Sequence, residues 1–155
     1  MSATTQPLNP PSTNRLALHA TVHCLTGCSI GEILGMVIGA ALELRNGPTI
    51  ALSVALAFVF GYLLTMLPLL RGGEAFGSAM KLAFASDTVS VAVMEIVDNG
   101  VMLVIPGAMD AGLRDPKFWG SLALSLLLAG IAAFPVVRWL VARSRGRGAA
   151  HAHHH

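Results

Sequence analysis

Four apolar stretches, each long enough to cross a lipid bilayer, dominate this chain of 155 residues. They cover about residues 16–44, 48–70, 87–109 and 118–141. A membrane-spanning helix needs roughly 20 predominantly apolar residues, and every stretch meets that length. Charged residues make up 12% of the chain, against about 25% in soluble proteins. We therefore expect an all-α integral membrane protein, in which residues 16–143 form a single four-helix transmembrane bundle within the lipid bilayer.

The distribution of Lys and Arg predicts how the bundle is oriented, because cytoplasmic loops of membrane proteins are enriched in these residues. With four spans, the two termini and the segment between the second and third spans lie on one side. That side has Arg15, Arg71, Lys81, Arg138, Arg143, Arg145 and Arg147, and the other has Arg45, Arg114 and Lys117. Both termini are therefore predicted to be cytoplasmic. The basic residues form no continuous stripe, so nucleic acid is not an expected partner.

Three segments outside the apolar stretches have their own composition. Residues 1–15 are rich in Pro, Ser and Thr and are expected to form a disordered tail. Residues 144–155 form a basic and His-rich tail, which is a purification tag, an unstructured tail or a native metal-binding segment. Residues 73–86 mix apolar and charged side chains, which is typical of an interfacial helix or of an early start to the third span.

The third apolar stretch has one polar face. At 100° per residue, Asp87, Met94, Glu95, Asp98 and Met102 fall within an arc of about 100°. A carboxylate at mid-membrane costs about 2.5–3.5 kcal/mol on insertion scales, so its default interpretation is an ion path, a proton relay or a metal ligand. Asp87 has an alternative role as a cap at the membrane interface. The other two carboxylates lie too deep for capping.

The first apolar stretch has a row of glycines, Gly27, Gly31, Gly35 and Gly39, spaced one helical turn apart. Such rows let two membrane helices approach closely. We expect this face to pack against another helix, and it is a candidate homo-oligomer interface. The same row continues backward to His23 and His19.

A second row on the same stretch contains Cys24, Cys28, Glu32 and Met36. Thiolate, imidazole and thioether ligands together suit copper or zinc, and thioether favours Cu(I). Glu32 lies about 180° around the helix from His23, so those two side chains cannot share one site in a straight helix. A structural role for the cysteines, as small buried hydrophobic residues, is the alternative.

The two unusual faces are predicted to meet. Counted from the start of each span, Cys24 lies at the depth of Glu95, and Cys28 at the depth of Asp98 or Asn99. This match predicts one composite metal site between the first and third spans. Its expected ligands are His23, Cys24, Cys28, Met94, Glu95 and Asp98, with His19, Glu32, Asp87, Asn99 and Met102 as relay or supporting residues.

Several of these segments resemble a bacterial family of four-helix membrane proteins that is known only as a domain of unknown function. The segments are His23 to Glu32, Met94 to Asn99 together with Asp87, and Pro106 to Asp110. The resemblance extends from His19 to Trp139. It implies a location in the bacterial inner membrane. Some members carry the label copper oxidase, which favours copper.

The favoured function is binding or transport of a metal ion, with copper preferred and zinc or iron as alternatives. A membrane redox enzyme that uses heme, iron or a quinone is the second hypothesis; a covalently attached heme is excluded, because no Cys-x-x-Cys-His motif is present. A proton- or cation-conducting oligomer and an assembly subunit of a membrane complex are further hypotheses. Hydrolase, P-loop and dinucleotide-binding motifs are absent from the sequence.

Overall fold

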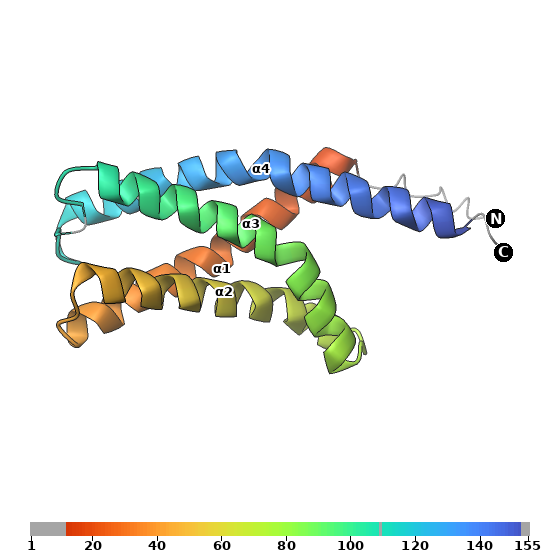
Figure 1. The fold of residues 1–155 in the computed structure, drawn as a ribbon, viewed down its shortest axis with the longest axis horizontal. Helices are drawn as coiled ribbons and strands as arrows, with labels where there is room; N and C mark the ends of the chain where they lie inside the picture. Colours follow the sequence, from red (N-terminus) through yellow and green to blue (C-terminus); the bar gives the residue numbers. More distant parts are fainter. Residues whose placement is uncertain (1–11, 109, 153–155) are drawn as a thin grey trace, which may run out of the picture.

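The computed structural model describes residues 12–108 and 110–152, with side chains as far as Arg143. This part of the chain contains four helices and no strand (Figure 1). The helices are α1 (Thr13–Ala41), α2 (Asn46–Arg71), α3 (Phe76–Val104) and α4 (Pro116–Ala152). The expected all-α four-helix bundle is therefore confirmed. Most of the predicted N-terminal tail and the last three histidines lie outside the described residues.

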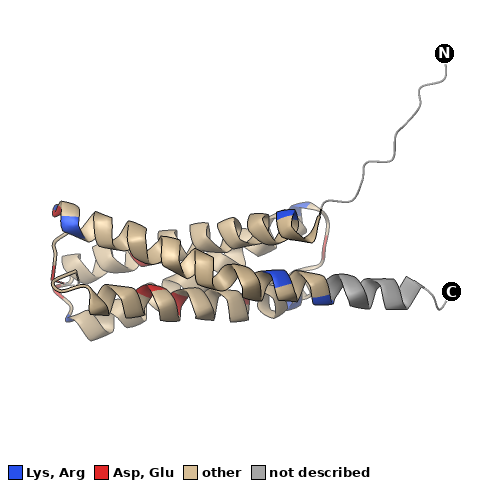
Figure 2. Ribbon diagram, turned by 90° about the horizontal axis from the view of Figure 1, so that it is seen from above, with Lys and Arg blue, Asp and Glu red and all other residues tan. Residues whose placement is uncertain are grey.

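The start of α1 and the end of α4 lie at the same end of the bundle (Figure 1). Lys and Arg gather at the two ends of the bundle (Figure 2). α1, α2 and the Pro116–Arg143 part of α4 are long and apolar enough to cross a membrane. α3 has a similar length but carries Lys81 and three carboxylates. Its apolar side faces outward, with Ile96 73% exposed, as a lipid-facing surface requires.

The glycine row of α1 packs against α2 of the same chain. Gly27 lies against Gly61, Gly31 against Ala57, Gly35 against Ser53 and Gly39 against Thr49. A Cβ atom added to Gly31 would lie 2.2 Å from the backbone nitrogen of Ala57, so the two backbones are in direct contact. The prediction of close helix packing is confirmed. The prediction that this face mediates a homo-oligomer is wrong, because α2 covers it.

α3 begins at Phe76, well before the predicted start at Asp87, so the segment before Asp87 belongs to the same helix. Figure 1 shows the helix changing direction within its first half. Hydroxyl groups there bond back to the helix backbone: Ser86 Oγ donates to the Ala83 carbonyl at 3.2 Å, and Ser90 Oγ donates to the Asp87 carbonyl at 3.0 Å. Such bonds bend helices.

The ends of the other helices also depart from the expected positions. α3 stops at Val104 because Ile105 precedes a proline and adopts an extended backbone, with φ −74° and ψ 114°. α4 continues to Ala152, so most of the segment that was expected to be a tail is helical.

The contact between α1 and α2 gives a prediction for stability. Gly31→Ala should lower the free energy of unfolding by about 1–3 kcal/mol, because the new methyl group meets backbone and the helices must separate. Gly100→Ala is the matched control, since a Cβ atom at Gly100 would have no neighbour within 4 Å. Thermal unfolding in detergent measures both. Equal melting temperatures for the two variants would contradict the packing described.

Candidate functional site

The second row of α1 faces the polar face of α3, and we call this contact the α1–α3 seam. Its residues are deeply buried: Cys28 is 1% exposed, Glu32 2%, Met94 1% and Asp98 2%. The members of the seam are Cys24, Cys28 and Glu32 from α1, with Asp87, Ser90, Met94, Glu95 and Asp98 from α3. The predicted meeting of these two faces is therefore observed.

The first level of the seam is centred on Cys24 and Asp87. Cys24 Sγ and Ser90 Oγ share a hydrogen bond at 3.5 Å. Ser86 Oγ donates to Asp87 Oδ1 at 2.7 Å, and the Thr65 side chain of α2 interacts with the same carboxyl group, whose Oδ2 is buried. Asp87 lies inside a long helix and is 6% exposed, so the alternative that it caps a helix at the interface is wrong.

Two cavities open on this level. One, of about 330 Å³, has His23 and Cys24 of α1 on one side and Asp87 of α3 on the other, with Thr65 of α2 between them. The second, of about 300 Å³, also has Cys24 and Asp87 in its wall and is bordered by Arg143 of α4. Asp87 is therefore in the wall of both cavities, beside Cys24.

The second level joins Cys28 to Glu95. The Cys28 thiol and the Glu95 carboxyl group lie close enough to interact electrostatically. Asn99 holds that carboxyl group in place, because its Nδ2 donates to Glu95 Oε2 at 3.3 Å and to the Glu95 carbonyl at 2.9 Å. Cys24, Cys28 and Met94 are members of the same buried apolar cluster.

The third level is a pair of facing carboxyl groups. Glu32 and Asp98 are within hydrogen-bonding range of each other. No other described residue donates to Glu32 Oε1 or to either carboxyl oxygen of Asp98. Two buried carboxyl groups in this arrangement need either a shared proton or a bound cation, since two facing negative charges repel each other.

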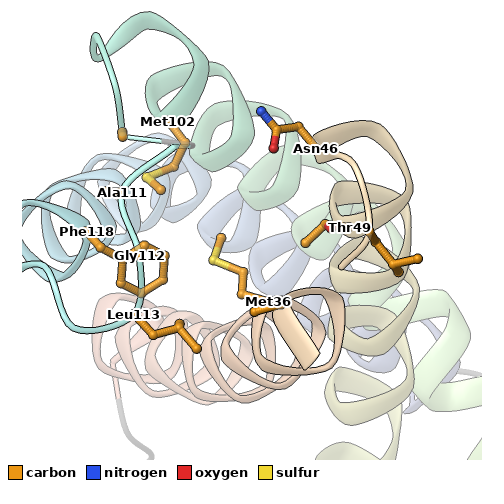
Figure 3. A pocket seen from close by; sticks show the side chains of 11 residues that line it. Met36, Asn46, Thr49, Met102, Ala111, Gly112, Leu113 and Phe118 are labelled. Carbon is orange, nitrogen blue, oxygen red and sulfur yellow. The ribbon is translucent and has the colours of Figure 1, made fainter. Parts of the chain in front are cut away.

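Beyond the third level, the seam ends in a pocket of about 140 Å³. Met36 of α1 and Met102 of α3 line it, together with Phe118 of α4 and the loop residues Ala111 to Leu113 (Figure 3). Cavities therefore lie at both ends of the row of buried thiols and carboxyl groups.

The register of the seam differs from the prediction. Cys24 was expected opposite Glu95 and Cys28 opposite Asp98 or Asn99. Instead, Cys24 contacts Ser90, Cys28 contacts Glu95, and Glu32 contacts Asp98. The difference is about one helical turn. Counting depth from the ends of the helices does not predict it, since α1 begins at Thr13 and α3 at Phe76.

The predicted ligands consequently do not surround one point. His23 and Cys24 lie at the first level, Cys28, Met94 and Glu95 at the second, and Asp98 at the third. Among the side chains that the structure describes, in residues 12–108 and 110–143, no three of His, Cys, Asp or Glu come close enough together to hold a metal ion. His19 is exposed and lies outside the seam.

Sequence reasoning missed two contributors and gave too little weight to a third. Ser90 lies one turn before Met94 on the same face of α3, so its position in the sequence predicted its place in the seam. Thr65 comes from α2, and no pattern in that apolar helix distinguishes it. Glu32 was assigned a supporting role but is a central member of the third level.

These features define a class: a multi-pass membrane protein whose four-helix bundle encloses a seam of thiols, thioethers and carboxyl groups. The chain belongs to the family described as Domain of unknown function (DUF4396), whose model matches residues 13–146. That match includes α1, α2, α3 and most of α4. No curated protein and no solved structure matches the chain.

The facing carboxyl groups lead to a second stability prediction. Glu32→Gln should raise the free energy of unfolding of metal-free protein by about 1 kcal/mol, because its amide can donate to the unpartnered oxygens of Asp98. Glu74→Gln, at an exposed position, is the control and should change nothing. Thermal unfolding after treatment with a chelator measures the effect. A clear loss of stability in Glu32→Gln would argue against two facing carboxyl groups.

Proposed function

We propose that this protein binds a soft metal ion inside the membrane and moves it across, with copper(I) as the favoured ion. The main support is the buried cluster that contains Cys24, Cys28 and Met94. Thiolate and thioether ligands select Cu(I) over harder ions. We further propose that the membrane is the bacterial inner membrane. We also propose that both termini are cytoplasmic, which the distribution of Lys and Arg favours.

The carboxyl groups of the seam suit this role. A metal cation in the membrane interior needs compensating negative charge, since isolated charges there are costly. Glu95 lies beside Cys28, and the Glu32–Asp98 pair lies one level further along. Asp87 shares the walls of two cavities with Cys24, where a carboxylate can attract a cation toward the thiol.

Zinc, iron and heme have weaker support. Structural zinc sites use four Cys, His or carboxylate ligands, and no three such side chains converge in the described residues. For heme, His23 and Met102 are poorly placed as a pair of axial ligands, because they line cavities at opposite ends of the seam.

A second candidate function is conduction of protons or hard cations. The specific observation in its favour is the Glu32–Asp98 pair. Each of the two residues is 2% exposed, and both have carboxyl oxygens that receive no hydrogen bond from the described residues. In this alternative the carboxyl groups carry the function and the thiols only fill space.

The metal-binding proposal is tested by measuring Cu(I) affinity without oxygen, in competition with a chromophoric chelator. The full chain is used with His151, His153, His154 and His155 replaced by Ala, so that the tail binds no metal. Cys24→Ser/Cys28→Ser should lower the Cu(I) affinity by at least about 100-fold. Changing a residue that only supports a metal ligand lowers the affinity by about 100-fold at most. Met80→Leu is the control, since Met80 is 43% exposed and lies outside the seam. Unchanged affinity in the double variant would contradict the proposal.

The two candidate functions are separated in liposomes. If the protein moves Cu(I), Cys24→Ser/Cys28→Ser should abolish uptake of Cu(I), and no metal-independent proton flux should be present. If it conducts protons, flux should persist in that variant and should be lost in Glu32→Gln/Asp98→Asn. A pH-sensitive dye and a Cu(I)-sensitive dye enclosed in the same vesicles report both activities.

A further inference from the structure

The pocket at the far end of the seam has two thioethers in its wall. Met36 comes from α1 and Met102 from α3, and Figure 3 shows both sulfur atoms directed toward the space between them. Met102 is 1% exposed, so its side chain is almost completely buried in the wall of this pocket. The pocket volume is about 140 Å³.

The presence of this space argues against a purely packing role for the two residues. Methionine is flexible and usually fills irregular gaps in a protein core. Here the two methionines border a gap that they leave open. Most of the remaining lining is apolar, apart from Asn46 and Thr49, so the thioethers are the softest donor groups in the wall of the pocket.

The position of the pocket connects it to the seam. Met36 follows Glu32 by one turn on α1, and Met102 follows Asp98 by one turn on α3. The rows that carry the thiols and carboxyl groups therefore end in these two thioethers. At the surface beside the pocket, Asn46 Nδ2 donates to Asp110 Oδ1 at 3.4 Å, which links the start of α2 to the loop after α3.

We propose that Met36 and Met102 form a second site for a soft monovalent metal ion, at the end of the seam away from the chain termini. The site deepens the proposed function and rests on it. Thioethers are neutral, whereas thiolates are charged, so this site binds the ion more weakly than the Cys24–Cys28 site. Weak binding suits a place where the ion enters or leaves the seam.

The test follows the methyl signals of ¹³C-labelled methionines by NMR during titration with Ag(I), a soft monovalent ion without redox chemistry. The full chain carries the same four His→Ala changes in its tail, and signals are assigned with Met36→Leu and Met102→Leu, which nearly conserve volume. The signals of Met36 and Met102 should shift at Ag(I) concentrations above those that saturate the thiols. The signal of Met80, an exposed residue outside the seam, should not shift.

The same titration in Cys24→Ser/Cys28→Ser separates this inference from the proposed function. Shifts of Met36 and Met102 that persist in this variant support the thioether site, whatever the thiols do. Thiol binding in the parent chain without any shift of these two signals overturns the thioether site and leaves the proposed function in place. If Ag(I) binds neither the two thiols nor the two thioethers, the thioether site and the proposed function are both overturned.

Discussion

The direct backbone contact between α1 and α2 determines how the rest of the bundle is arranged. Gly31 and Gly35 have no side chains to hold the helices apart, so one face of α1 packs directly against Ala57 and Ser53 of α2. The next row of α1 lies about 100° away. Seating the glycines on α2 therefore directs Cys28 and its neighbours toward α3, where they are enclosed.

Enclosure gives the seam its chemical character. Glu32 and Asp98 are almost completely buried, and the opposite side of α3 is exposed and apolar. Carboxyl groups kept inside a bundle in this way are costly to insert and mark paths for ions or protons. Their position beside two thiols, with cavities at both ends, is the physical basis for proposing that a soft cation passes along the seam.

Much of this arrangement could be predicted from periodicity alone. The lengths of the apolar stretches predicted the four helices. The glycine spacing predicted the close packing of α1, and the polar arc predicted the buried face of α3. Three features could not be obtained in this way. The start of α3 lies in a segment of mixed polarity, so neither its position nor the register of the seam followed from the apolar pattern. The other two features depend on which helices become neighbours. They are the helix that packs against the glycine row and the contribution of Thr65 to the seam.

The central claim, that sulfur atoms of the α1–α3 seam hold the metal, is tested most directly by X-ray absorption at the copper edge. The sample is the full chain with its four tail histidines replaced by Ala and loaded with one equivalent of Cu(I). In this sample we expect a coordination shell of sulfur atoms. In Cys24→Ser/Cys28→Ser most of these sulfur ligands should be absent. A shell of nitrogen and oxygen only, or a sulfur shell that the double variant leaves unchanged, would contradict it.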